Sequence, residues 1–318
     1  MKLNSSYTVS LFTILISTFM SMMSNNWLFM WMLMEINLFM FIPIMSKNKV
    51  TNQSIKYFIL QSFSSYLLIF SILMMSIFDS SWNNSMFTSV ALLIKIGMAP
   101  FHMWIPEIMK MISWNECFIL STLIKITPMI LMNKLCSFKL IILPISLSLI
   151  MGSLSGFNQT SLKKIMAFSS VFNMSWMLTS FYLKKKILLI FISIYFLLTF
   201  KIMKFFKINS MVYVNQINHL NLENKMKINL MMLSMMGLPP LMGFLPKWFI
   251  LKELSNKSNF ISMCMILTSL MSIFMYIQMN SISLMNLSYK KKNFKQMNLY
   301  SISTINLFCL PFMYLLIE

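Results

Sequence analysis

Apolar runs long enough to cross a lipid bilayer follow one another along almost the whole chain. A window of about 19 residues finds eleven of them. Their approximate ranges are 7–23, 27–45, 57–78, 86–105, 117–132, 140–156, 165–182, 187–206, 229–250, 260–284 and 299–317. The runs are too long for barrel strands and lack their alternation. We therefore expect an all-α, polytopic membrane protein with short loops and no soluble domain.

The charges of the chain lie mainly between these runs. Only 10% of the residues are charged, and the 26 basic residues are all lysine, which gives a formal net charge of +19. Such a charge suggests nucleic-acid binding, but the lysines are spread over short gaps and form no basic patch. If the spans alternate, fifteen loop lysines fall on the side of the N-terminus and seven on the other. Because positive loops stay on the side of synthesis, the N-terminus is expected there and the C-terminus on the opposite side.

The amino-acid usage points to a place of synthesis. An AT-rich gene explains lysine in place of arginine, but 38 methionines do not fit a code in which every Met codon needs a G. A code that also reads ATA as Met, as in animal mitochondria, explains both; chance enrichment of Met as flexible core filler is the alternative. We therefore expect a protein of the mitochondrial inner membrane, with its N-terminus in the matrix and its C-terminus in the intermembrane space.

A short glycine and proline motif, G-x-x-P-x5-P, occurs twice. Its residues are Gly97, Pro100 and Pro106 in the first copy, and Gly237, Pro239, Pro240 and Pro246 in the second. Since proline removes a helix hydrogen bond, both spans should be broken in the same way. The copies lie five spans apart, so the second crosses the membrane in the opposite sense, which is typical of an inverted repeat. Ordinary proline kinks in packed helices are the alternative.

The inverted-repeat interpretation divides the chain into three parts. Residues 1–133 would form the first five-helix repeat, 134–285 the second, inverted five-helix repeat, and 286–318 a loop and a C-terminal transmembrane helix.

Among the ionisable residues inside the apolar runs, four are candidates for chemistry: Glu35, Lys95, Lys125 and Lys247. A charge at the bilayer centre costs about 2.5–3.5 kcal/mol on insertion scales, so such residues usually pair or face water. Burial favours a neutral amine and a nearby carboxylate favours a charged one, so a buried lysine can take a proton from one side and release it to the other. Movement of Glu35 relative to Lys95 would be enough to switch it.

Other interpretations of these residues stay open. Glu35 and Lys95 could form a merely structural ion pair, and Lys125 and Lys247 could snorkel to the membrane surface. His102, two residues after Pro100, is either a proton relay or a hydrogen-bonding group at a helix end.

Three segments carry a family resemblance: Leu33–Asn37, Lys95–Pro106 and Gly237–Lys247. Together they resemble the antiporter-like membrane subunits of mitochondrial respiratory complex I, and the run K-x-G-x-A-P-F-H-x-W-x-P is the most specific part. The resemblance implies two inverted five-helix repeats around a central polar axis. It makes Glu35 and Lys95 the switching pair, Lys125 the central relay and Lys247 the residue toward the exit side. One departure is Leu123-Ile124 before Lys125, where the family pattern has Trp-Gln.

The resemblance also implies a function. It predicts a proton-translocating subunit, coupled to NADH:ubiquinone electron transfer, that is part of an enzyme only within the complex. Its partners would be other membrane-arm subunits, including other antiporter-like ones, and lipids. NADH, FMN, iron–sulfur clusters and ubiquinone would be used by other subunits; the four cysteines here form no CxxC pair. A stand-alone cation/proton antiporter and a structural subunit without pumping are the alternatives.

Overall fold

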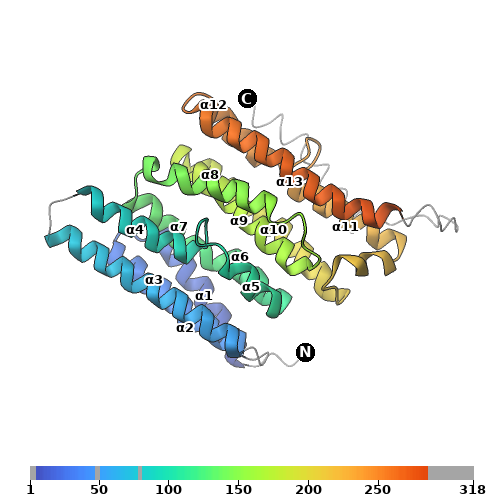
Figure 1. The fold of residues 1–318 in the computed structure, drawn as a ribbon. Coiled ribbons are helices and arrows are strands. Elements are labelled where there is room, and N and C mark those ends of the chain that lie inside the picture. Colours follow the sequence, from blue (N-terminus) through green and yellow to red (C-terminus); the bar gives the residue numbers. More distant parts are fainter. Residues whose placement is uncertain (1–4, 47–50, 78–80, 286–318) are drawn as a thin grey trace. The chain divides into compact units, whose positions relative to one another are not determined.

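The computed structural model describes residues 5–46, 51–77 and 81–285, and this part is helical almost throughout (Figure 1). The chain divides into two compact units, residues 1–148 and 149–318. The first unit contains α1 (Ser5–Met23), α2 (Trp27–Ser46), α3 (Thr51–Ile77), α4 (Ser81–Ile96), α5 (Trp104–Met111), α6 (Trp114–Ser121) and α7 (Leu123–Leu135). The boundary between the units falls inside α8 (Phe138–Leu154). The second unit contains α9 (Leu162–Leu183), α10 (Lys185–Ile208), the 3-10 helix η1 (Val214–His219), α11 (Leu222–Met236), α12 (Phe244–Ser255) and α13 (Asn259–Met285).

The expected fold class is confirmed: within the described residues the chain is an all-α protein with several apolar helices of membrane-spanning length. Six helical stretches there are long and apolar enough to cross a bilayer: Ser5–Met23, Trp27–Ser46, Thr51–Met74, Trp114–Leu135, Lys186–Ile208 and Asn259–Met279. Helices also form at the other four predicted spans up to residue 284, where they are interrupted, short or more polar. The predicted eleventh span, 299–317, and the whole segment 286–318 lie outside the described residues. The division after residue 133 concerns an inverted repeat and stays a prediction.

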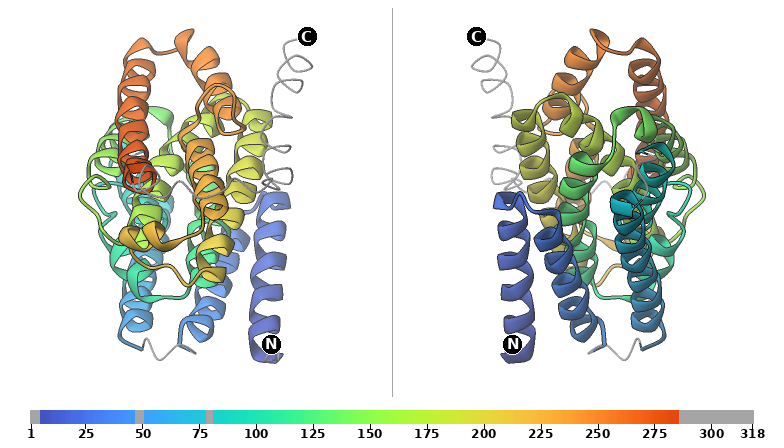
Figure 2. Two further views of the ribbon diagram at one scale, coloured as in Figure 1. Left: turned by 90° about the vertical axis from the view of Figure 1, so that its right-hand side faces the viewer. Right: turned by 90° about the vertical axis from the view of Figure 1, so that its left-hand side faces the viewer.

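The core of the first unit is built around α7, which packs against α1, α2, α4 and α6. Side chains at most of its positions from Leu123 to Met132 are buried. The helices α1 and α2 run side by side in this unit (Figure 2). Small buried residues of α1, such as Ser17 and Ser21, let two helix backbones approach closely, which is the usual way helices associate in lipid.

The core of the second unit is built around α9, which packs against α10 and α12. Every side chain from Ile165 to Ser180 is buried, so this helix has no lipid-facing side in its middle turns. Its hydroxyl groups, such as those of Ser175 and Thr179, donate to carbonyls one turn earlier, which satisfies these donors within the helix. A helix buried all round accommodates this polarity better than one exposed to lipid.

Contacts between loops agree with spans that cross in alternating directions. In the first unit, the Nζ of Lys134 near the end of α7 donates to the Ser24 carbonyl just after α1, at 2.5 Å. In the second unit, Thr160 before α9 accepts at 3.0 Å from the amide of Val214 after α10. Each contact joins two connections that an alternating topology places on one side of the membrane.

The connection near residues 207–228 is shorter than expected. The helix α10 ends at Ile208 and α11 already begins at Leu222, so Lys225, expected in a loop, is helical and 5% exposed. An ion pair between Lys227 and Glu223, at 2.5 Å and four residues apart, supports this first turn. A hydropathy window does not detect a helix start of this kind, because its charged residues lower the mean hydropathy of the window.

Candidate functional site

The first copy of the motif separates α4 from α5. Gly97 has a φ of +73°, which favours glycine, and it ends α4 directly after Ile96. Pro100 lies in the break, whereas Pro106 lies in the first turn of α5, where no helix hydrogen bond is lost. A Cβ at Gly97 would come within 2.2 Å of the Ile105 side chain, so the two half-helices approach closely here.

Partners from three directions take up the carbonyl groups that this break frees at the end of α4. The Leu93 carbonyl accepts from the amides of Gly97 and Met98, at 2.9 and 3.1 Å. The indole of Trp104 donates to the Ile94 carbonyl at 3.2 Å. The side-chain amide of Gln61 in α3 donates to the Lys95 carbonyl, also at 3.2 Å. The carbonyls of Leu93, Ile94 and Lys95 are therefore all satisfied, and an unpaired backbone group in an apolar interior would be costly.

Lys95 and Glu35 form a buried ion pair beside this break. The Nζ of Lys95 lies 2.9 Å from the Oε1 of Glu35, and their side chains are 3% and 17% exposed. Lys95 belongs to the last turn of α4 and Glu35 to the middle of α2. The sequence-predicted pair is thus brought together, with a carboxylate and an amine in direct hydrogen-bond contact.

Lys125 lies in the first turn of α7 and is 2% exposed. The expected single span divides here into α6 and α7, which separate at Thr122. The Thr122 hydroxyl donates to the Phe118 carbonyl at 2.6 Å, one turn earlier. Pro128 cannot donate within α7, and the Thr127 hydroxyl donates instead to the Ile124 carbonyl, at 3.4 Å. Since α7 packs against both α2 and α4, Lys125 belongs to the same helix cluster as the ion pair.

The second copy of the motif separates α11 from α12. Gly237 ends α11 with a φ of +81°. A Cβ there would lie 3.0 Å from the Gly243 carbonyl oxygen and 3.1 Å from the Cδ of Lys247. Pro239 and Pro240 lie in the break, and Pro246 lies in the first turn of α12. The two breaks are therefore built alike, each from a left-handed glycine, a proline turn and a proline that starts the next helix.

Lys247 is buried inside the second unit and is 7% exposed. Its Nζ donates to the carbonyl of Met236, the last residue of α11, at 2.8 Å. The same nitrogen lies 5.3 Å from the ring centre of Phe172 and 5.6 Å from that of Trp176, both in α9. Within the described residues, Lys247 takes part in no ion pair.

A small cavity adjoins Lys247 in the second unit. Its volume is about 20 Å³, enough for about one water molecule. It is lined by Asn173, Phe191, Ile194, Tyr195, Leu198, Met235, Gly243, Pro246 and Lys247. Asn173 and Tyr195 thus line the same space as Lys247.

His102, proposed from sequence as a relay or a helix-end group, lies in the first break and is 2% exposed. Its carbonyl accepts from the Ile105 amide at 3.2 Å. The position fits both sequence interpretations, and the role of the imidazole stays a prediction.

Sequence reasoning missed several buried polar residues in the first unit. Gln61 is 34 positions from the carbonyl it caps, and nothing in its local sequence marks it. Asn37 accepts a hydrogen bond from Ser17 of α1 in the apolar interior. Glu116 is 3% exposed and accepts from the Ser113 amide at 2.9 Å, at the start of α6. The S-x-x-E spacing of a helix start could have found this last residue.

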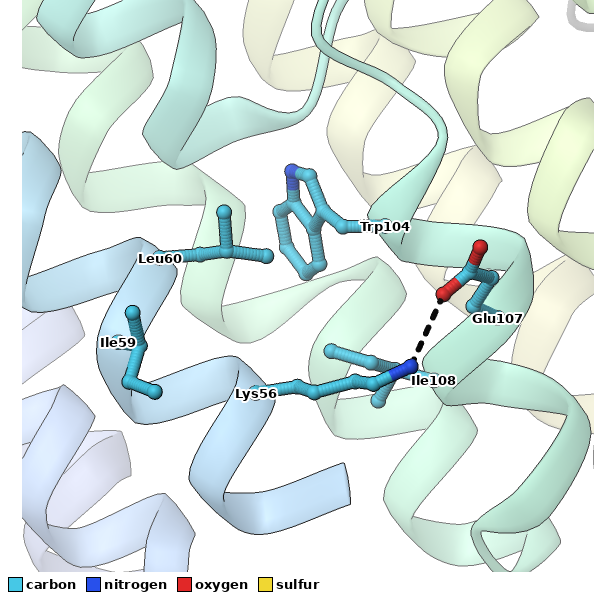
Figure 3. A pocket seen from close by; sticks show the side chains of 6 residues that line it. All are labelled: Lys56, Ile59, Leu60, Trp104, Glu107 and Ile108. Atoms are coloured by element: carbon cyan, nitrogen blue, oxygen red, sulfur yellow. Dashed lines mark hydrogen bonds and ion pairs between the residues drawn. The ribbon is translucent and has the colours of Figure 1, made fainter. Parts of the chain in front are cut away.

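A second, more open pocket lies on the first unit between α3 and α5 (Figure 3). Its volume is about 220 Å³, and it is lined by Lys56, Ile59, Leu60, Trp104, Glu107 and Ile108. Lys56 and Glu107 form an exposed ion pair at 3.4 Å across it. The ring of Trp104 thus faces this pocket while its indole N–H caps the carbonyl next to Lys95.

Metal ligands were not expected in this chain. Among the residues that the structure describes, no group of three His, Cys, Asp or Glu side chains could hold a metal ion. The expectation that redox groups belong to other subunits stays a prediction.

Comparisons with known proteins agree with this architecture. Residues 24–274 match the family model of the transmembrane proteins of NADH:quinone oxidoreductase and Mrp antiporters. The chain is 36% identical to NADH-ubiquinone oxidoreductase chain 2 of Anopheles gambiae, covering 92% of this chain and 90% of that one. It is 33% identical to the protein of the same name from Bos taurus, covering 86% and 84%.

Solved structures share the fold. A chain of respiratory complex I from Thermus thermophilus superimposes with a TM-score of 0.78 at 17% identity, over 88% of this chain and 71% of that one. A chain of the Mrp complex from a Dietzia species gives 0.72 at 12% identity, over 84% and 58%. From the family model and the sequence relatives it follows that this chain belongs to the family of NADH-ubiquinone oxidoreductase chain 2, among the transmembrane proteins of NADH:quinone oxidoreductases and Mrp antiporters.

Proposed function

We propose that this chain is a proton-translocating membrane subunit of a respiratory NADH:ubiquinone oxidoreductase. The observation that carries the proposal is the buried pair of Glu35 and Lys95 at 2.9 Å, next to a helix break, in a chain of this family. Electron transfer from NADH to ubiquinone would take place in other subunits, and this chain would take part in the enzyme only as a member of the complex.

The pair supports a simple switch. When both groups are ionised, the carboxylate holds the proton on the amine by direct attraction in a medium that screens charges poorly. If Glu35 moves away, the ammonium of Lys95 loses its counter-charge and gives up one proton, which leaves a neutral amine. The proton passes to the next acceptor, and a proton taken up later restores the ammonium when Glu35 returns.

The other buried lysines supply the remaining steps of the proposal. Lys125 would receive the proton within the first-unit helix cluster, and Lys247 would pass it on toward the exit side. Burial of both amines, at 2% and 7% exposure, supports this assignment over snorkelling, which needs the head group in the interfacial region. The single-water cavity beside Lys247 supports proton exchange there.

The proposal extends to the membrane in which the chain lies, its topology and its partners. The chain would span the mitochondrial inner membrane many times, with its N-terminus in the matrix and its C-terminus in the intermembrane space. Its partners would be other membrane-arm subunits, including other antiporter-like ones, and the residues 1–133 and 134–285 would be related as inverted repeats.

Replacement of Lys95 by Met tests the proposal in the assembled complex. The matched control is Lys201→Met, which changes a half-buried lysine of α10. We expect Lys95→Met to lower the number of protons moved per electron while the control leaves it unchanged. Normal stoichiometry and turnover in Lys95→Met would favour a structural subunit without pumping.

A stand-alone cation/proton antiporter is a second candidate, because the matching family includes Mrp antiporters. The isolated chain in sealed vesicles separates the two functions. Proton movement driven by a sodium or potassium gradient, without any partner subunit, would support the antiporter. We expect no such movement.

A further inference from the structure

Lys95 directly precedes the first break and Lys247 directly follows the second, and their neighbours differ in kind. Lys95 faces the carboxylate of Glu35 at 2.9 Å. Lys247 takes part in no ion pair with the residues that the structure describes, and faces two aromatic rings and one carbonyl. An amine buried to 7% exposure without a carboxylate requires another means of holding its charge.

The two rings are placed by the helix that carries them. Phe172 and Trp176 are four residues apart on α9, so they lie on one face of the helix. Their ring centres are 6.4 Å apart and their planes are inclined by 58°, so both can face one cation. A Cβ at Gly152 of α8 would lie 2.9–3.0 Å from the N, Cα and Cβ of Phe172, so α8 packs directly against the backbone of α9 at this residue.

Trp176 makes little use of its polar atom. The residue is 0% exposed, and no group in the described part of the chain accepts a hydrogen bond from its Nε1. A buried N–H without a partner is unfavourable by about 1–3 kcal/mol, and few such groups occur in native structures. The indole contacts Lys247 through its ring, whose centre lies 5.6 Å from the Nζ.

The chemistry of a ring differs from that of a carboxylate in one decisive respect. A ring face attracts a cation within about 6 Å, and more strongly when water is excluded. It cannot accept the proton, whereas Glu35 can take the proton of Lys95. An ammonium held by rings keeps its proton until a water or another lysine removes it.

We infer that Phe172 and Trp176 form an aromatic cage that holds Lys247 as an ammonium in place of a counter-ion, and directs its proton to the cavity lined by Asn173 and Tyr195. This inference rests on the proposed function. Phe172 and Trp176 are positioning residues, because they act on the proton only through Lys247.

The test compares ring removal with ring retention in the assembled complex. Trp176→Leu removes the ring, and Trp176→Phe keeps a ring face although it also leaves a void. We expect the first variant to lower proton-translocating turnover about tenfold, and the second to restore most of it. Phe172→Leu should act in the same direction and serves if Trp176→Leu does not assemble. The control Trp248→Leu removes a ring from Lys252 on α12 and should leave turnover unchanged.

A double variant separates this inference from the proposed function. In a Lys247→Ala background, Trp176→Leu should have no further effect on turnover, because the cation is gone. If Lys247→Ala alone pumps normally, the proposed role of Lys247 is wrong. If Lys247→Ala is impaired but Trp176→Leu and Phe172→Leu both pump normally, or Trp176→Phe is as impaired as Trp176→Leu, the cage alone is wrong.

Discussion

Glu35 and Lys95 depend on each other because Lys95 is buried and Glu35 is only 17% exposed. A buried ion pair adds little net stability, but removal of one partner leaves a charge without compensation. The pair of Lys56 and Glu107 is the natural contrast, since its side chains are 56% and 61% exposed and water solvates each charge separately.

Replacement of Glu35 by Gln should therefore lower the stability of the solubilised protein by about 3–5 kcal/mol. Glu107→Gln should change it by less than about 1 kcal/mol. Denaturant unfolding in detergent measures both. Adding Lys95→Met to Glu35→Gln should recover part of the loss, and additive losses in the double variant would show that the pair is not coupled.

The hydrogen bond that Gln61 donates to the Lys95 carbonyl should also contribute to stability. The Gln61 amide caps the Lys95 carbonyl at 3.2 Å, so Gln61→Leu should leave a buried acceptor unpaired and cost about 1–3 kcal/mol. The neighbouring Ser62→Ala removes only a bond to the Ile59 carbonyl in the same helix and is the control. Equal unfolding free energies for the two variants would contradict the capping role.

At the scale of the elements, a glycine ends the helix at each of the two breaks. Pro43, Pro128 and Pro144 all lie inside helices that continue past them. The helices end at Gly97 and Gly237, whose φ values of +73° and +81° other residues rarely adopt. The glycine and proline motif thus predicted the positions of both breaks. At each break it is the glycine, in a left-handed backbone conformation, that ends the first half-helix.

Gly237→Ala should therefore strongly reduce both the stability of the protein and its proton translocation. The left-handed backbone costs roughly 1–2 kcal/mol for alanine, and its Cβ would press on the Cδ of Lys247 at 3.1 Å. Gly156→Ala is the matched control in the same unit, because its Cβ would meet only the flexible Met275 side chain and its φ is not positive. We expect Gly237→Ala to lose proton translocation and thermal stability together, and Gly156→Ala to keep translocation.

The positions of the helices could be predicted from the sequence, because a segment that crosses a bilayer must have a sufficient length and hydropathy. Sequence reasoning also found the residues at which α4 and α11 end, and the partnership of Glu35 with Lys95. It could not find the division of one span at Thr122, which depends on local backbone angles. Gln61 and Trp176 were equally out of reach, since each acts on a residue far away in the chain.

At the scale of the whole molecule, the topology is defined by the direction in which each span crosses the membrane. Loop contacts within each unit agree with alternation, and the lysine distribution predicts the absolute direction. An inverted relation between the two repeats requires the connections after α5 and α10 to face the matrix, and those after α1 and α12 to face the other compartment.

Single cysteines placed at exposed sites test this arrangement with a membrane-impermeant thiol reagent. Asn115→Cys and Ser210→Cys should be labelled only from the matrix side. Asn25→Cys and Asn256→Cys should be labelled only from the opposite side. The unsubstituted chain gives the background, and labelling of Ser210→Cys and Asn256→Cys from one side would overturn the inverted repeat.

Lys95 and Lys247 have different surroundings, and this difference determines how each responds to the membrane voltage. A proton that passes between Glu35 and Lys95 travels about the 2.9 Å that separates them. In a hydrocarbon layer of about 30 Å, this step crosses at most about a tenth of the voltage, or about 0.2 kcal/mol per 100 mV. Lys247 has no acid so near among the described residues, so its proton arrives and departs through a larger share of the field. An energised membrane should therefore bias the charge on Lys247 and leave proton exchange within the pair of Glu35 and Lys95 almost unaffected.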